Sequence, residues 1–191
     1  MRIGLPLAIV AVLAGCVPAG RTAPGAMPVD RDEVAVWATL IDSVFAADGA
    51  PFVVVADSTW HMIITVDDIR VEARRLDLDF PESAVDDYGA RNRTHVSIPR
   101  RLPTRTPNRR FRLETLAPRG DRAAAHERFR RENAPVVHYH FFSRPGFDAA
   151  RSHAVITTAI CDLYCFAGQL FILVRGAHGW RVVKREETWV T

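Results

Sequence analysis

Residues 136–190 read VVHYHFFSRPGFDAARSHAVITTAICDLYCFAGQLFILVRGAHGWRVVKREETWV, and they carry the clearest strand pattern in the chain. It contains four runs rich in β-branched and aromatic residues, which are typical of strands and span 136–143, 154–161, 169–175 and 180–190. Short connections separate them, at Pro145-Gly146, residues 162–168 and residues 176–179. Because short connections force neighbouring strands to run antiparallel, we expect a four-stranded antiparallel meander.

Near the N-terminus, the sequence predicts a helix from Asp30 to Asp48. Asp30 and Glu33 have the spacing of a capping box, and Gly49 stands where a left-handed cap would end the helix. Apolar residues repeat at helical spacing between these ends, at Val34, Trp37, Ile41, Val44 and Phe45.

The middle of the chain predicts shorter elements. They are a buried strand over 52–55, a helix opening at Pro81-Glu82 with Val85 and Tyr88 inward, an irregular loop over 99–109, a strand over 111–115, and a basic helix over 121–133 anchored by Phe129. Helices early and strands late indicate the α+β class. We therefore expect one domain over 30–191, in which an N-terminal helix and a helical or irregular middle segment pack on the meander, with Phe147 and Trp180 in its core.

The first sixteen residues, MRIGLPLAIVAVLAGC, have the form of an export signal. Arg2 is followed by an apolar stretch, Leu5 to Leu13, that is too short to span a bilayer. Leu13-Ala14-Gly15-Cys16 resembles the lipobox of bacterial lipoproteins. The resemblance implies removal of residues 1–15 and attachment of fatty-acyl chains, such as palmitate, to Cys16. The alternatives are an ordinary secretory signal with an incidental cysteine and a buried apolar helix.

A tether and an envelope location follow from that resemblance. Residues 16–29 are rich in Pro, Gly and Ala without periodicity, as expected of an extended linker. We expect a lipid-anchored protein of the bacterial cell envelope, facing the periplasm or on the outer membrane. The residue after Cys16 is Val17, whereas an aspartate at that position would favour retention in the inner membrane of enteric bacteria.

The other two cysteines, Cys161 and Cys165, lie four residues apart. On a straight strand their Cα atoms would be about 13 Å apart, well beyond the ~7 Å limit of a disulfide. A disulfide therefore requires a tight loop between them. Two free thiols and half of a metal site are the alternatives.

His138 and His140 lie on one face of a predicted strand, a spacing that metal sites use. Together with Cys161 and Cys165 they would make a two-histidine, two-cysteine zinc set. A polar strand face is the simpler interpretation, and an oxidising compartment disfavours free thiols.

The 191 residues carry a net charge of +3, which conceals two opposed blocks. Residues 30–90 hold 14 acidic residues and 4 arginines, whereas residues 91–131 hold 13 arginines and 3 acidic residues. The simpler interpretation is two solvated or facing surfaces. The alternative is contact with an anionic envelope component through Arg100, Arg101, Arg105, Arg109, Arg110 and Arg112. Nucleic acid is not an expected partner, because few aromatic residues accompany the arginines.

No catalytic motif is present in the sequence. It lacks a nucleophile elbow, the zinc-protease helix motif and a glycine-rich phosphate loop. Asp57, Ser58 and His61 are close in sequence, but sequence proximity is not triad geometry. We therefore assign no catalytic residue and no cofactor.

The landmarks of the C-terminal third also resemble a family of uncharacterised bacterial secreted proteins and lipoproteins. They are Phe142-Ser143-Arg144-Pro145-Gly146-Phe147-Asp148, Ala154-Val155-Ile156, Cys161-Asp162-Leu163-Tyr164-Cys165, Gly179-Trp180-Arg181-Val182 and Thr188-Trp189-Val190. The family reads approximately L-S-R-V-G-F-N, A-L-V-Y-V, C-G-x-L-C-G-x-G, G-x-W-K-V and W-I-S at these places. The resemblance supports the fold and the Cys161–Cys165 disulfide, and it implies no activity. This chain departs from the pattern at Pro145, Asp148, Asp162 and Phe166.

The expected function is thus a membrane-anchored lipoprotein whose domain is a non-catalytic envelope or interaction module. The alternatives are an envelope hydrolase with an unidentified site and a metal-binding protein that uses His138 and His140.

Overall fold

The computed structural model describes residues 28–43, 51–60, 63–75, 80–104, 111–114, 122–162 and 164–190. In these residues the chain has the α+β architecture expected from the sequence. The helices are α1 (Arg31–Ser43), α2 (Val66–Arg75), α3 (Glu82–Arg91) and α4 (Arg122–Asn133). The strands are β1 (Val53–Ala56), β2 (Phe111–Glu114), β3 (Tyr139–Phe142), β4 (Gly146–Phe147), β5 (His153–Cys161), β6 (Cys165–Gly176) and β7 (Gly179–Val190).

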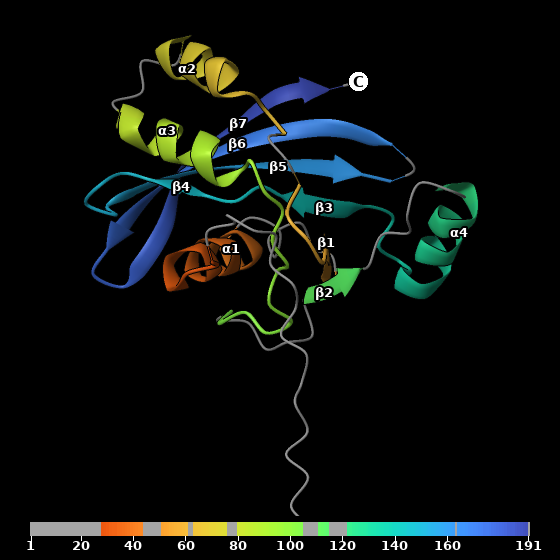
Figure 1. Cartoon of the computed structure of the whole chain (residues 1–191). Coiled ribbons are helices and arrows are strands. Elements are labelled where there is room, and N and C mark those ends of the chain that lie inside the picture. Colours follow the sequence, from red (N-terminus) through yellow and green to blue (C-terminus); the bar gives the residue numbers. More distant parts are fainter. Residues whose placement is uncertain are drawn as a thin grey trace, which may run out of the picture.

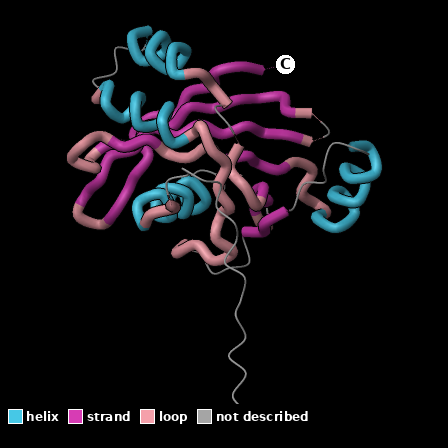
Figure 2. Tube along the Cα trace, viewed as in Figure 1, coloured by secondary structure: helices cyan, strands magenta, loops and turns pink. Residues whose placement is uncertain are grey.

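The strands form one mixed sheet of seven strands in the order β2-β1-β3-β5-β6-β7, with β4 paired to β5 (Figures 1 and 2). The expected strands are present and β3, β5, β6 and β7 pair antiparallel in turn. The prediction of a four-stranded meander is nevertheless wrong, because β1 pairs parallel with both β2 and β3 and widens the sheet. Parallel neighbours are joined by long crossovers, and such partners leave no signal in local sequence.

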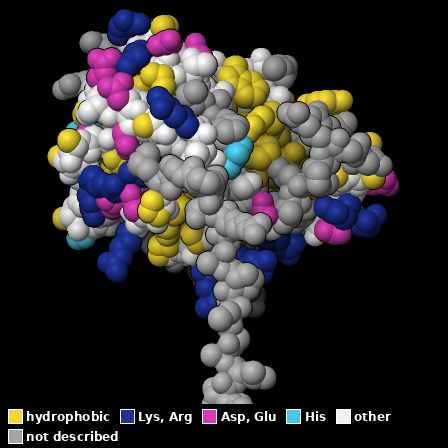
Figure 3. Space-filling model, viewed as in Figure 1, with side chains coloured by type: hydrophobic (Ala, Val, Ile, Leu, Met, Phe, Trp, Pro, Cys, Tyr) yellow, Lys and Arg dark blue, Asp and Glu magenta, His cyan; other side chains and the backbone are white. Residues whose placement is uncertain are grey.

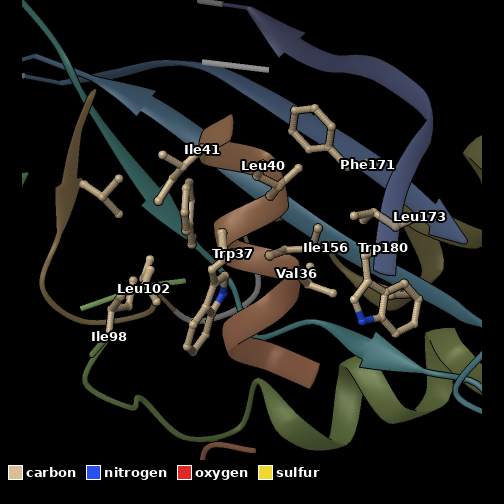
Figure 4. Packing of buried hydrophobic residues seen from close by; sticks show 14 of the residues in the cluster. Val36, Trp37, Leu40, Ile41, Ile98, Leu102, Ile156, Phe171, Leu173 and Trp180 are labelled. Carbon is tan, nitrogen blue, oxygen red and sulfur yellow. The ribbon is translucent and has the colours of Figure 1, made fainter. Parts of the chain in front are cut away.

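Helix α1 packs on one face of the sheet. Its start is the expected capping box: the Asp30 carboxylate accepts the Glu33 N–H at 3.0 Å, and the Glu33 carboxylate accepts the Asp30 N–H at 2.9 Å. Trp37, Leu40 and Ile41 are buried against the strands (Figure 4). The predicted residues after Ser43, with Val44, Phe45 and Gly49, lie outside the described part of the chain.

Helices α2 and α3 cover part of the opposite face (Figure 1). Side chains alternate along β5, so that Ala154 and Ile156 belong to the α1 cluster and Val155 to the α2–α3 cluster. Val85 and Tyr88 point inward from α3 as predicted. Helix α2 is not predicted from the sequence, because most of its residues are charged and only Ile69 is buried.

Helix α4 lies at the other end of the sheet and contributes Phe129, the predicted anchor, to a cluster with Phe52, Val54 and Val136. The predicted core residues Phe147 and Trp180 are buried and contact each other, with ring centroids 5.6 Å apart. Residues 99–104 are irregular as expected, and residues 105–110 lie outside the description. No helix in the described ranges is long and apolar enough to cross a membrane.

Candidate functional site

Among the described residues, the most buried charges form an ion pair between Arg144 and Glu33. Both side chains are fully buried. The guanidinium is bidentate on the carboxylate, with Nε to Oε1 at 2.7 Å and Nη2 to Oε2 at 3.0 Å. Arg144 binds a backbone carbonyl as well as the acid. The second partner is the carbonyl of Pro28, which accepts from Nη2 at 3.3 Å.

Further ion pairs surround the Arg144–Glu33 pair at the start of α1, and we call the whole set the junction. Arg91, 7% exposed at its side chain, lies 2.7 Å from Asp87 and 3.4 Å from Asp30. Arg151 binds Asp30 at 2.9 Å and Asp32 at 3.1 Å. Burial opposes ionisation of Asp30, but the Glu33 N–H and the two arginines together hold the pKa of that carboxyl below its ordinary value. The junction therefore joins α1, α3 and the β3–β4 connection through satisfied opposite charges.

Asn92 completes the junction on the backbone side. Its amide donates to the Arg144 carbonyl and accepts from the Arg144 N–H, both at 2.7 Å. The two backbone groups of a residue with a buried charge are thus paired as well. The arrangement holds the Pro28 carbonyl just before α1, and it leaves the buried charges paired with one another.

A second polar cluster gathers an acid, a serine and a histidine at the β4–β5 turn. The Ser152 hydroxyl donates to the Asp148 carboxylate at 2.6 Å, and the His153 Nδ1 lies 3.2 Å from the same oxygen and 2.9 Å from the hydroxyl. A nucleophilic triad needs the serine on one imidazole nitrogen and the acid on the other. Here both contact Nδ1, so the cluster is a turn cap rather than a triad.

The cap also lowers the pKa of Asp148. Burial works to raise it, but the N–H groups of Ser152 and His153 together with their side chains bring the pKa to about 2. Since this value lies below the ordinary 3.8, the cap stabilises the folded protein at pH above about 4 and loses that contribution as the pH falls through 2.

Replacing Asp148 with Asn tests the cap. We expect the free energy of unfolding to fall by about 1–2 kcal/mol at pH 7 and by much less at pH 2, because the wild-type carboxyl is then partly protonated. Chemical denaturation at the two pH values measures this. Asp67→Asn is the control. Because the Asp67 side chain is 90% exposed, we expect only a small change in the free energy of unfolding. An equal loss at both pH values would contradict the assignment.

One cavity of about 180 Å³ opens between α1, the β6–β7 turn and Pro103. Its lining includes Asp42 and Ser43 of α1 and His178 of the turn. This cavity brings together residue types that a hydrolase uses, and none of them was a candidate from the sequence. Their signal is absent from the sequence because Ser43 and His178 are 135 positions apart.

Aromatic side chains come to the surface on the sheet face that carries α2 and α3. Trp60 is 38% exposed, and its ring lies 4.7 Å from that of Phe141. The Tyr139 ring follows at 5.5 Å from Phe141. Figure 3 shows hydrophobic side chains reaching the surface over the strands, beside the charged side chains of the helices. The three rings together make a half-exposed apolar surface.

Of the predicted histidine pair, His140 lies on β3 and His138 lies directly before that strand. The rings of His138 and His140 are 5.4 Å apart, and His140 is 6% exposed. Burial lowers the pKa of His140 to about 3, assisted by the charges of His138 and Arg185, so this imidazole is neutral at ordinary pH. In the described ranges no group of three or more His, Cys, Asp or Glu residues is placed to hold a metal ion.

Cys161 and Cys165 are joined in a disulfide across the β5–β6 turn. The chain reverses between them, which is the tight loop that a bridge requires, and Cys161 pairs with Cys165 in the sheet register. The two-histidine, two-cysteine zinc set is therefore wrong, since the sulfurs are not available as thiolate ligands.

The predicted anionic-contact arginines are only partly described. Arg100 and Arg101 are exposed in the segment after Ile98. Arg112 on β2 donates to the Glu132 carbonyl at 3.2 Å and lies 4.0 Å over the Phe52 ring, which gives it a structural role. Arg105, Arg109 and Arg110 lie outside the described residues, as do Cys16 and His61. Asp57 and Ser58 follow β1, where Ser58 forms a bridge with Ser97.

The comparisons with known proteins add no relative. No family model, no curated protein and no solved structure matches the chain.

Proposed function

We propose that the chain is a lipoprotein of the bacterial cell envelope, anchored to a membrane through acylated Cys16, whose folded domain is a non-catalytic interaction module. The observation that carries the proposal is the sequence Leu13-Ala14-Gly15-Cys16 directly behind a short apolar stretch. One acyl chain gives marginal membrane binding, and the two or three chains of a lipoprotein anchor firmly.

The short stretch of sequence between Cys16 and α1 supports a tether. Pro28 follows Cys16 by twelve residues, and its carbonyl is held by the buried guanidinium of Arg144. Twelve residues reach at most about 40 Å when fully extended. A domain anchored through Cys16 would thus stay close to the bilayer surface.

The electrostatics support a non-catalytic module. The buried carboxylate of Glu33 is matched by arginines, and Asp148 is committed to a turn cap. Catalytic groups are more often held with pKa values close to the working pH. A pKa of about 2 at Asp148 and of about 3 at His140 keeps both groups in one protonation state near neutral pH.

Exposed Arg100 and Arg101 suit contact with anionic headgroups near such an anchor. Each basic residue close to an anionic surface contributes about 1 kcal/mol of attraction. We propose this contact as an accessory to the lipid, and nucleic acid is not part of the proposal.

Replacing Cys16 with Ser tests the anchor, because a hydroxyl cannot form the thioether. We expect the variant to leave the membrane fraction, or to accumulate unprocessed, whereas the wild type stays in membranes after washing with high salt. Immunoblots of fractionated cells, with labelling by a fatty acid, measure both. Val17→Ser is the matched control and should remain acylated. Acylation of the Cys16→Ser variant would refute the proposal.

A further inference from the structure

Strand β7 forms one margin of the sheet. It is the last strand in the pairing order, with β6 on one side and no strand of the described residues on the other (Figure 2). It is 12 residues long, well above the five or six of a common strand. A long edge strand presents unpaired backbone groups to which another strand can bind.

The central part of this edge carries charges of both signs in a definite order. Lys184, Arg185, Glu186 and Glu187 pair in regular register with Ile172, Phe171, Leu170 and Gln169, and register shifts flank this stretch on both sides. Alternation places Lys184 and Glu186 on one face and Arg185 and Glu187 on the other. Within the chain Glu186 pairs with Lys184 at 2.9 Å and lies 4.0 Å from Arg75 of α2.

This order of charges is complementary to itself. In an antiparallel pair of β7 strands centred on Arg185, Lys184 of each copy lies opposite Glu186 of the other. Centred on Glu186, Arg185 of each copy lies opposite Glu187 of the other. Each register gives two directly opposed pairs of opposite charge. The two identical residues at the centre carry the same charge, but each also has an oppositely charged residue diagonally across the strand pair.

Charges of a single sign on an edge keep two copies of a protein apart, whereas this edge has a positive and a negative residue on each face. Two of the exposed large hydrophobic residues, Val183 at 42% and Val190 at 66%, also lie on β7. We propose that two copies of this chain pair antiparallel through β7, centred on Arg185 or Glu186, to form one continuous sheet.

Charge reversal in the full chain tests this pairing. Lys184→Glu or Glu186→Lys alone turns both direct pairs of the register centred on Arg185 into like pairs. In the register centred on Glu186 it turns the favourable diagonal pairs of residues 184 and 186 into like pairs, so we expect the dimer to weaken about tenfold in sedimentation equilibrium. The double reversal, K184E with E186K, restores opposite charges and should restore the wild-type dimer. Arg74→Glu, on the exposed side of α2, is the control and should leave it unchanged.

Cross-linking fixes the geometry in the same chain. Arg185→Cys or Glu186→Cys should give a disulfide-linked dimer on non-reducing gels, and Arg181→Cys, far from either centre, should give none. A wild-type chain that sediments as a monomer at all concentrations would overturn the pairing. So would a double reversal as weak as the single variants, or equal cross-linking at residue 181. The anchor is not needed for this pairing, so the loss of one claim leaves the other standing.

Discussion

Replacing Arg144 with Met is expected to lower the free energy of unfolding by about 3–5 kcal/mol, because it leaves the Glu33 carboxylate buried without its bidentate partner. Both side chains are fully buried, so water cannot replace the guanidinium. The variant also loses the hydrogen bond to the Pro28 carbonyl. Urea denaturation of wild type and variant measures the difference, with the circular dichroism of the native states compared first.

Two further variants separate the ion pair from general damage. Glu33→Leu combined with Arg144→Met removes both charges, and we expect it to be more stable than Arg144→Met alone. Arg70→Met is the matched control, since Arg70 pairs with Glu82 and Asp86 at side chains 71% and 62% exposed and should cost less than about 1 kcal/mol. A loss below 1 kcal/mol for Arg144→Met would contradict the role given to the junction.

Replacing Gly146 with Ala is expected to cost at least about 3 kcal/mol, because the added methyl meets backbone. A Cβ at this position would lie 2.2 Å from the Ala84 carbonyl oxygen and 2.2 Å from the Tyr88 nitrogen. Backbone atoms cannot turn away as a side chain does, so α3 would have to move from β4. Thermal and urea unfolding of the variant measure the loss.

Gly176→Ala is the matched control on β6. Its Cβ would meet only the Gly179 carbonyl oxygen, at 3.8 Å, which is an ordinary contact. We expect a change within about 0.5 kcal/mol. Equal stability of the two alanine variants would show that α3 does not approach β4 as closely as described.

Local patterns predicted the local parts of the fold. The capping box of Asp30 and Glu33, the inward Tyr88 and the anchor Phe129 each follow from spacing within one element, and all are confirmed. The Cys161–Cys165 loop was likewise one of the outcomes that chain geometry allowed, and the structure forms the disulfide.

Partners far apart in the chain were beyond such patterns. The parallel pairing of β1 with β2 and β3 depends on which strands meet across long crossovers, and a four-residue apolar strand carries no record of that. The Arg144–Glu33 pair joins residues 111 positions apart. The sequence indicated Glu33 as part of a helix cap, but its contact with Arg144 is a property of the fold. For the same reason the cavity with Asp42, Ser43 and His178 had no signal.

The most direct test of the central claim is mass spectrometry of the N-terminal peptide of the protein extracted from membranes. We expect a mature chain that begins at Cys16, with a diacylglyceryl thioether on the sulfur and, where the host adds it, an acyl group on the amine. A membrane-extracted or secreted chain with an unmodified Cys16, whether it begins at Met1 or at another residue, would contradict it.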